Sequence, residues 1–207
     1  MFKVGLCGFG SMGKGHAQLL QKHEGVKLVS IADVRPDCRE KAEADYGVKT
    51  WECGEAMIAA GGLDVVFICV PTYLHAPLAI QAMTAGCHVF CEKPMAMRDD
   101  EAYRIMRAVR THQVKLCVDL NRRMAPALQA LKKAWQAQVA APRHSAWRYM
   151  EQQRAMLPEE DHTHLLIRIQ DESSSYGLGH LDPLTGGGEI IGESVHWLDL
   201  ACWFFAP

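Results

Sequence analysis

The chain has 207 residues, of which 49% are hydrophobic and 22% are charged, a mixture typical of a globular protein. This composition excludes a collagen-like chain, a coiled-coil rod and an intrinsically disordered chain. The formal net charge is −2, so the chain as a whole lacks the basic field that binds nucleic acids or anionic membranes, and we expect neither as a partner.

The charged residues are unevenly distributed along the chain. Residues 151–207 contain 10 of the 24 acidic residues and only two of the 22 basic ones, Arg154 and Arg168. The acidic residues of this part alternate with Leu, Ile, Trp and Phe and do not form a run. The pattern therefore predicts a second folded region and not an acidic interaction tail.

None of the eight cysteines is part of a CxxC pair, and four of them lie in apolar, strand-like runs. We interpret them as reduced thiols, and we predict no metal site. The first residues do not form the apolar segment of a signal peptide, and no apolar stretch of about 18 residues occurs. A cytoplasmic location is the expectation that follows, since that compartment keeps thiols reduced.

Short apolar runs alternate with amphipathic stretches through the first 120 residues. Strands are predicted at residues 4–7, 26–33, 65–70, 88–91 and 115–120, and helices at residues 13–22, 37–46, 55–60, 76–85 and 100–111. The continuous apolar run at 65–70 should be buried on both faces of a sheet. This repeated alternation predicts an α/β fold with a doubly wound parallel sheet.

The pattern changes after Asn121. A long helix rich in Ala and Leu is predicted over residues 125–138, followed by extended segments at 145–149 and 165–169. A turn of three glycines at 186–188 then opens a final apolar segment that reaches Phe205. The two parts of the chain therefore differ in the order of their elements.

A GxGxxG motif lies directly after the first predicted strand and opens the first helix. It consists of Gly8, Phe9, Gly10, Ser11, Met12 and Gly13. The glycines allow a tight turn and a close approach to a pyrophosphate, which the free N–H groups of the helix N-terminus bind. Asp33 ends the second strand, 20 residues beyond Gly13, where a carboxylate can accept both hydroxyls of an adenosine ribose. The pattern predicts a dinucleotide site; the alternatives are a plain glycine turn beside a surface Asp and the glycine-rich turn of a methyltransferase.

Glu92, Lys93 and Pro94 follow the strand predicted at 88–91. Ligands of open α/β sheets bind beyond the carboxyl ends of the strands, so Lys93 should point toward the cofactor. Pro94 lacks an N–H group and fixes the turn. A lysine ammonium there can donate to a substrate hydroxyl oxygen and assist its deprotonation. The alternative is a solvated lysine in a turn.

A second polar cluster lies in the last apolar segment, where Glu193, His196 and Asp199 recur every three residues. In a helix they would share one arc of about 120 degrees, and ionisable groups on so apolar a helix must be paired or face a cleft. His196 suits proton exchange with a sugar hydroxyl, and a histidine held inside the core is the alternative. Arg122 and Arg123 can hold a substrate phosphate or carboxylate, or form a salt bridge beside a helix.

These motifs together resemble the glucose-fructose oxidoreductase / inositol dehydrogenase / MocA family of dinucleotide-dependent oxidoreductases. The matching segments are residues 4–13, 31–33, 70–76, 85–94 and 186–199. The resemblance implies a Rossmann domain over residues 1–123, followed by an α+β domain over residues 124–207. In the family, the open sheet of that second domain forms the floor of the substrate site and often an oligomer face, so a homo-oligomer through this sheet is implied as well.

The resemblance also implies roles for individual residues. It assigns Lys93 to catalysis and His196 to substrate binding or proton transfer. Thr72, His75 and Glu92 would line the nicotinamide side of the cofactor pocket. The expected substrate-binding residues are Arg123, Glu193, His196 and Asp199.

Two features depart from the family pattern. Many members carry an Asp four residues before the histidine, whereas this chain has Gly192 there and Glu193 next to it. Family members are also usually much longer than 207 residues, so we expect the second domain to be partial.

The sequence therefore predicts an NAD(P)-dependent oxidoreductase that transfers a hydride between a nicotinamide cofactor and a polyol, sugar or sugar derivative. Asp33 should repel a 2′-phosphate and favour NAD over NADP, although Arg35 lies close enough to weaken that preference. Two alternatives belong to other classes: an NAD-dependent glycoside hydrolase of the same family, and a non-catalytic dinucleotide-binding sensor or remnant. The substrate itself stays open, because the segment between residues 140 and 186 carries no recognition pattern.

Overall fold

The computed structural model describes residues 1–140 and 194–205. These residues fall into two compact units, which we describe separately. The first unit contains Met1–Asp119, and the second contains residues 120–140 together with residues 196–205. The predicted domains, 1–123 and 124–207, include residues outside these ranges and stay a prediction, as do the extended segments at 145–149 and 165–169.

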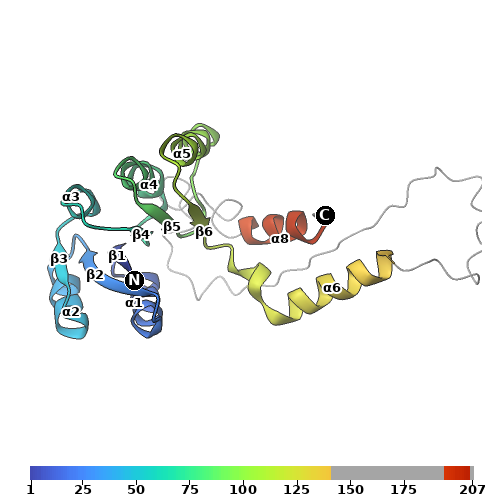
Figure 1. Ribbon diagram of the computed structural model, residues 1–207, viewed down its shortest axis with the longest axis horizontal. Coiled ribbons are helices and arrows are strands. Elements are labelled where there is room, and N and C mark those ends of the chain that lie inside the picture. Colours follow the sequence, from blue (N-terminus) through green and yellow to red (C-terminus); the bar gives the residue numbers. More distant parts are fainter. Residues whose placement is uncertain (141–193, 206–207) are drawn as a thin grey trace, which may run out of the picture. The chain divides into compact units, whose positions relative to one another are not determined.

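A six-stranded parallel sheet forms the centre of the first unit (Figure 1). Its strands are β1 (Phe2–Cys7), β2 (Val26–Ala32), β3 (Lys49–Trp51), β4 (Val65–Ile68), β5 (His88–Cys91) and β6 (Leu116–Val118). They are ordered β3-β2-β1-β4-β5-β6, and every neighbouring pair is parallel. The order reverses between β1 and β4, where open α/β sheets bind ligands at the carboxyl ends of their strands. The predicted doubly wound α/β fold is confirmed.

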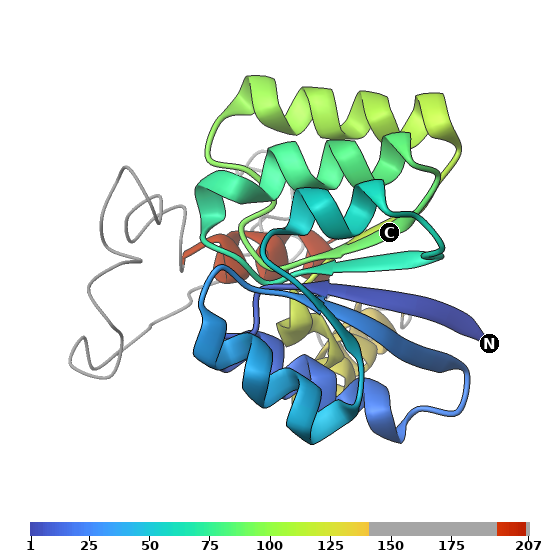
Figure 2. The ribbon, with the colours of Figure 1, turned by 90° about the vertical axis from the view of Figure 1, so that its left-hand side faces the viewer.

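Five α-helices connect the strands of the first unit. They are α1 (Ser11–Lys22), α2 (Pro36–Tyr46), α3 (Gly54–Ala59), α4 (His75–Thr84) and α5 (Asp99–His112), with a short 3-10 helix, η1 (Thr72–Leu74), before α4. Figure 2 shows α1 and α2 on one face of the sheet and α3, α4 and α5 on the other. Local sequence explains the ends of α2: Pro36 suits a first helical turn, and Gly47 ends the helix in the left-handed conformation, with φ at 61°.

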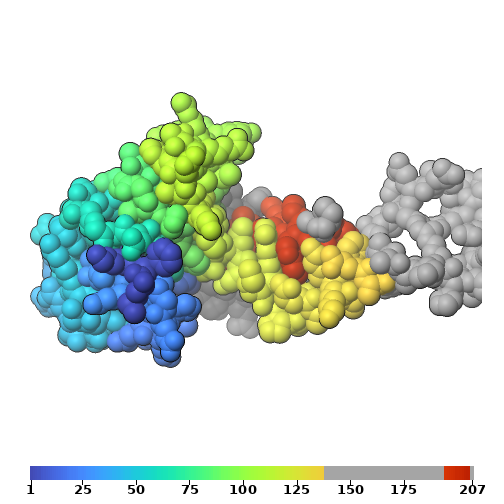
Figure 3. Space-filling model, in the orientation of Figure 1, coloured from blue at the N-terminus to red at the C-terminus, as the bar shows by residue number. Residues whose placement is uncertain are grey.

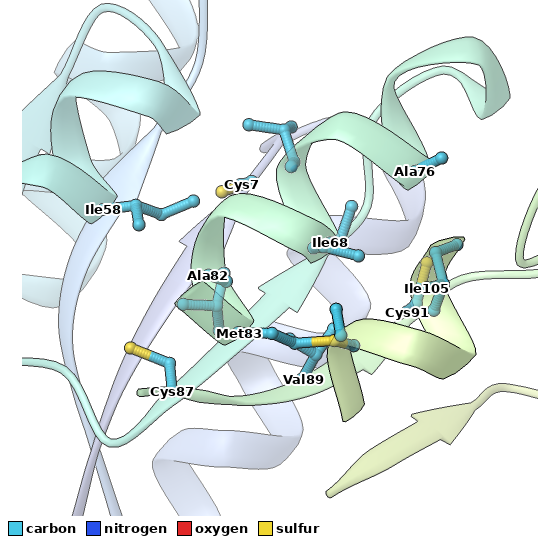
Figure 4. Packing of buried hydrophobic residues seen from close by; sticks show 14 of the residues in the cluster. Cys7, Ile58, Ile68, Ala76, Ala82, Met83, Cys87, Val89, Cys91 and Ile105 are labelled. Atoms are coloured by element: carbon cyan, nitrogen blue, oxygen red, sulfur yellow. The ribbon is translucent and has the colours of Figure 1, made fainter. Parts of the chain in front are cut away.

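Two clusters of buried side chains fill the space between the sheet and its helices. The cluster on the side of α3, α4 and α5 includes Cys7, Ile68, Met83, Val89, Cys91 and Ile105 (Figure 4). The cluster on the opposite side consists of Leu6, Phe9, Ala17, Ile31, Cys38 and Ala42. Because successive strand residues point to opposite faces, neighbours such as Leu6 and Cys7 belong to different clusters. A single strand thereby anchors both layers of helices.

Strand β4 lies in the middle of the sheet, and its burial differs between its two faces. Val66 and Ile68 are fully buried, whereas Val65 and Phe67 are only half-buried. The expectation that the run 65–70 is buried on both faces is therefore wrong for the face of Phe67. On this face the imidazole ring of His16 lies edge-on against Phe67, with 5.7 Å between the ring centroids. His16 itself belongs to a polar cluster.

The sequence predicts five of the six strands and misses β3. This strand has only three residues, begins with Lys49 and pairs with β2 alone at the edge of the sheet. It therefore has no apolar run long enough to indicate a strand. The five helices predicted in this unit are all present, with ends shifted by one or two residues.

The second unit contains η2 (Asn121–Met124), α6 (Pro126–Ala140) and α8 (Val195–Phe205). The rings of Trp135 and Phe204 lie 5.1 Å apart and pack α6 against α8. Lys132 Nζ also donates to the carbonyl oxygen of Trp203 at 2.6 Å. The predicted helix at 125–138 is confirmed, and the final apolar segment is helical from Val195. None of the helices in the described ranges combines the length and the apolar character needed to span a bilayer.

Candidate functional site

The glycine motif forms the turn between β1 and α1. Gly8 has a φ of 89°, and its N–H donates to the carbonyl oxygen of Ala32 at 2.7 Å. A Cβ at Gly8 would collide with the backbone of Cys69, and a Cβ at Gly13 would collide with the carbonyl of Gly8. A Cβ at Gly10, by contrast, would meet no atom within 4 Å. The first and third glycines are therefore required by packing, whereas Gly10 borders open space.

The N-terminus of α1 faces this turn without a side-chain cap, since Gly10 occupies the N-cap position. Uncapped N–H groups and the helix dipole favour an anion at such a terminus. Ser11 and Met12 are exposed here, whereas the side chain of Phe9 is fully buried and packs edge-on against Tyr46. The backbone N–H groups of this motif can therefore make the predicted cofactor contacts, whereas the buried side chain of Phe9 holds the turn in place.

Asp33 lies directly after β2 and binds the glycine turn. Its Oδ2 accepts the N–H of Phe9 at 2.7 Å, and its Oδ1 accepts the N–H of Arg35 at 2.9 Å. The side chain is only 8% exposed, and the exposed guanidinium of Arg35 lies 3.6 Å away. A carboxylate has about four acceptor sites, so it can still accept ribose hydroxyls in addition to these two N–H groups. The ribose contact itself stays a prediction.

Arg39 contributes to the same turn, and the sequence interpretation did not select it. Its Nη1 donates to the carbonyl oxygens of Asp33 at 2.9 Å and Val34 at 3.0 Å. The guanidinium thereby fixes the backbone that presents the Asp33 carboxylate. Its position one helical turn after the N-cap residue Arg35 is the only signal that the sequence offers.

The turn that carries Lys93 follows β5. Side chains contact its backbone at Lys93 and at Pro94. The Glu92 carboxylate accepts the backbone N–H of Lys93 through Oε2 at 3.3 Å. His75, at the start of α4, lies 2.7 Å from the carbonyl oxygen of Pro94 through Nδ1 and 2.9 Å from that of Val70 through Nε2. Lys93 itself is half-buried at this edge of the sheet. The turn therefore has little freedom to change shape.

His75 was expected to line the nicotinamide side of the cofactor pocket, and it is almost completely buried. Both of its ring nitrogens face backbone carbonyl oxygens, so a cofactor contact would have to come from its carbon atoms. Its clear role is to connect the end of β4 with the Lys93 turn. Thr72 is half-buried in η1, and its predicted cofactor contact stays a prediction.

A polar cluster formed by α1 and the ends of β5 and β6 lies next to the Lys93 turn. His16 Nε2 lies 2.8 Å from Glu92 Oε1 and 3.7 Å from Asp119 Oδ2. The imidazole ring stands edge-on against Phe90 at 5.2 Å, and Phe90 stacks on Phe67 at 4.5 Å. The sequence interpretation missed His16 and Asp119. The only signals were the place of His16 early in the first helix and of Asp119 directly after the last strand.

Charge and burial shift the ionisation of this cluster. The hydrogen bond to the Glu92 carboxylate raises the pKa of His16, and burial together with the charge of Glu92 raises the pKa of Asp119. Burial raises the pKa of the nearby Cys69 thiol far above its usual range, so this thiol stays protonated. The ligand atoms of His16, Cys69 and Glu92 lie within 4.8 Å of one another, a donor set that suits zinc. His16 and Glu92 already satisfy each other, however, so the geometry does not require an ion.

The second unit brings together two of the predicted substrate residues. The Arg123 guanidinium forms a bidentate ion pair with the Asp199 carboxylate through Nε and Nη2, and this pairing raises the pKa of Arg123. The pair connects η2 with α8, so a substrate contact of either residue stays a prediction. His196 is buried on α8, and Glu193 lies outside the described residues.

Arg122 occupies a different environment from its neighbour. Its guanidinium lies 4.5 Å from the centroid of the Trp197 ring. Both residues line a shallow pocket of the second unit, together with Asn121, Met124, Ala125 and Leu128. An aromatic face beside an amide and a cation is typical of small-molecule sites. Trp197 was not selected from the sequence.

The sequence was compared with models of known protein families. The model GFO_IDH_MocA, an oxidoreductase family with an NAD-binding Rossmann fold, matches residues 2–120. The chain belongs to this family. The matched segment contains the glycine turn, Asp33 and the Lys93 turn, so the resemblance noted from the motifs is confirmed.

Individual relatives match over different lengths. The inositol 2-dehydrogenase of Rhizobium meliloti (strain 1021) is 35% identical over 132 residues, which are 64% of this chain and 40% of the relative. The D-glucoside 3-dehydrogenase of Escherichia coli (strain K12) is 28% identical over 203 residues, 97% of this chain and 53% of the relative. The chain thus spans about half the length of these relatives.

A solved structure of a dehydrogenase with bound cofactor is also similar. The WlbA dehydrogenase from Bordetella pertussis, in complex with NADH and UDP-GlcNAcA, matches with a TM-score of 0.75 and 26% identity, over 100% of this chain and 59% of that chain. The residues of the present chain fit a dinucleotide on their own geometry as well. The open space at Gly10 adjoins the uncapped helix terminus, and the Asp33 carboxylate adjoins both.

Proposed function

We propose that the chain is the cofactor-binding part, with the catalytic lysine, of an NAD-dependent dehydrogenase that oxidises a hydroxyl group of a polyol or sugar. One observation carries this proposal. The helix of the glycine turn and the turn of Lys93 are joined by the 2.8 Å contact between His16 and Glu92. A phosphate-binding helix and a lysine are thereby held at the same edge of one sheet, where α/β enzymes bind their ligands.

The residues of the chain have separate tasks in this reaction. The N–H groups at the start of α1 bind the pyrophosphate, and Asp33 binds the ribose hydroxyls. NAD, when bound, supplies the hydride acceptor. Lys93 donates a hydrogen bond to the substrate hydroxyl oxygen and stabilises the negative charge that grows there as the O–H proton leaves, before the hydride leaves the carbon that bears this oxygen and the C=O bond forms. His196 is the candidate to take the hydroxyl proton, since an imidazole exchanges protons near neutral pH.

The substrate class rests on the relatives and on the pocket of the second unit. The relatives are named for inositol and D-glucoside, and the solved relative holds UDP-GlcNAcA. In this chain, the indole of Trp197 can pack against the apolar face of a sugar ring, and the side chains of Asn121 and Arg122 can donate to its hydroxyl or carboxylate oxygens. A ring-shaped polyol or a sugar fits these groups.

The proposal includes three further points. Asp33 disfavours the 2′-phosphate of NADP, so NAD is the preferred cofactor, with Arg35 moderating the preference. All eight cysteines are free thiols, which supports a reducing, cytoplasmic environment. Copies of the chain associate through the region after residue 123.

The cofactor part is tested by two matched glycine substitutions. Neither Gly10 nor Gly15 has an atom within 4 Å of an added Cβ, but only Gly10 borders the proposed pyrophosphate site. Gly10→Ala should weaken NAD binding at least about tenfold, because the methyl group occupies the place of the phosphate. Gly15→Ala, in the exposed middle of α1, should leave the affinity unchanged. Equal affinities of the two variants, measured by calorimetry, would contradict the assignment.

The chemical part is tested by turnover. The purified chain is incubated with NAD and a panel of inositols, glucosides and nucleotide sugars, and NADH formation is followed by absorbance. Lys93→Met should lower kcat about a hundredfold while the dissociation constant of NAD stays unchanged, because the interaction of Lys93 strengthens only in the transition state. A variant with the wild-type rate would show that Lys93 is structural.

A further inference from the structure

The carboxylate of Glu92 connects two parts of the first unit that are far apart in the sequence. Its Oε1 lies 2.8 Å from His16 Nε2, on α1, and its Oε2 accepts the backbone N–H of Lys93 at 3.3 Å. With one oxygen engaged on each side, the carboxylate cannot rotate without losing a hydrogen bond. His16 and the N–H of Lys93, with Asp119 beside them, therefore determine the orientation of Glu92 together.

We propose that His16 is a positioning residue for Lys93: its imidazole ring holds the Glu92 carboxylate, and that carboxylate holds the Lys93 backbone. The proposal deepens the proposed function, on which the catalytic role of Lys93 rests. His16 lies in the second turn of α1, the helix whose first turn would bind the pyrophosphate. One rigid helix therefore sets the position of the cofactor and of the lysine relative to each other.

The surroundings of the ring favour its charged form. The groups that face it are Glu92 after β5, Asp119 after β6 and the Cys69 thiol after β4, and the charge of Lys93 acts on Asp119. The hydrogen bond to the Glu92 carboxylate raises the pKa of His16 more than burial lowers it. Phe67 and Phe90 close the remaining sides of the ring, and only 12% of the His16 side chain is exposed. The Glu92 carboxylate, at 2.8 Å from Nε2, is therefore the nearest polar partner of a ring that is otherwise largely enclosed.

The Lys93 turn also has a second support that does not depend on His16. His75 binds the carbonyl oxygen of Pro94 from the side of α4. Removal of His16 should therefore leave the turn folded and shift it slightly, and a shift of this kind lowers the rate of a reaction without preventing cofactor binding. This separates positioning from a general contribution to stability.

The first experiment follows two NMR signals of the whole chain against pH: the imidazole of His16 and the backbone N–H of Lys93. If the chain of contacts is correct, the Lys93 signal moves with the same midpoint as the His16 ring. In His16→Gln the side-chain amide can still donate to Glu92 but does not titrate, so this movement should disappear. The control His112→Gln changes an exposed histidine of α5 and should preserve it.

The second experiment measures kinetics. His16→Leu should lower kcat about tenfold with less than about a twofold change in the KM for NAD, and His16→Gln should restore most of the rate. A Lys93 signal that ignores His16, or that still titrates in His16→Gln, would overturn the inference whatever the activity. A chain without dehydrogenase activity whose Lys93 signal follows His16 would instead overturn the proposed function and leave the positioning contact established.

Discussion

The two units of the molecule are held together by different kinds of interaction. In the first unit, a continuous ladder of parallel strands joins two buried clusters. In the second unit, α6 and α8 (yellow and red in Figure 3) meet through aromatic rings and the cation of Lys132, and the ion pair of Arg123 and Asp199 joins η2 to α8. On α8, the buried residues are His196, Leu200 and Phe204, whereas Leu198 and Phe205 are exposed.

This difference bears on the proposed function. Asp33 and Lys93, which it assigns to the cofactor and to catalysis, stand at strand ends of a packed sheet, where the backbone determines their positions. Arg122 and Trp197, which it assigns to the substrate, stand on a surface held by side chains. Substitutions in the first unit should therefore have larger energetic effects than those in the second.

The largest effect is expected in the sheet. Leu6 is fully buried in β1, and its replacement by Ala should destabilise the first unit by about 3 kcal/mol, because a cavity remains between the sheet and α1. Leu19→Ala is the control, since Leu19 lies on the exposed side of α1, and it should cost no more than about 0.5 kcal/mol. Hydrogen exchange of the β1 amides gives both values. Equal losses in the two variants would show that the sheet does not pack as described.

A smaller effect is expected from the ion pair of the second unit. Arg123→Met should lower the local stability of α8 by about 1 kcal/mol, because a bidentate pair is lost but its guanidinium is partly exposed to water. The exchange rates of the α8 amides report this loss, with the amides of β1 as an internal reference. Lys133→Met, on the exposed face of α6, should have no effect. If Arg123→Met accelerated the exchange of the β1 amides and not that of the α8 amides, the ion pair would not act on the second unit as described.

Much of the first unit can be predicted from the sequence, for a physical reason. An apolar run that follows a turn must be buried, and five such runs give five of the six strands. The glycine motif is equally clear, since its first and third glycines are places where backbone meets backbone. The place of Asp33 directly after β2 could be predicted because a strand ends there, and its ribose contact stays a prediction.

The partners of the polar side chains could not be predicted in this way. His16 and Glu92 are 76 residues apart, as are Arg123 and Asp199, and each pair meets only through the folding of elements between them. A salt bridge was one alternative for Arg123, but the sequence did not indicate Asp199 as its partner. The role of His75 came from the family resemblance alone, which does not indicate that two backbone carbonyl oxygens face its ring nitrogens.

The smallest effect concerns pH, and it distinguishes the ion pairs of the two units. Because the folded state raises the pKa of His16, this group stabilises the first unit fully below its unfolded value of 6.5, and the contribution is lost as the pH rises through the folded pKa. Asp119, whose pKa is also raised, acts in the same direction. Arg123, with its pKa raised by Asp199, stays charged throughout this range.

The stability of wild type relative to His16→Gln should therefore be about 0.5 kcal/mol greater at a pH of about 6 than at a pH of about 8, the difference between a charged and a neutral donor to Glu92. The advantage of wild type over Arg123→Met should be the same at both values. Urea unfolding followed by hydrogen exchange in each unit measures the two differences in one series. If the stability difference between wild type and His16→Gln did not change with pH, the ring would act as a neutral donor. The contact between α1 and the Lys93 turn would then be a hydrogen bond without an ion pair.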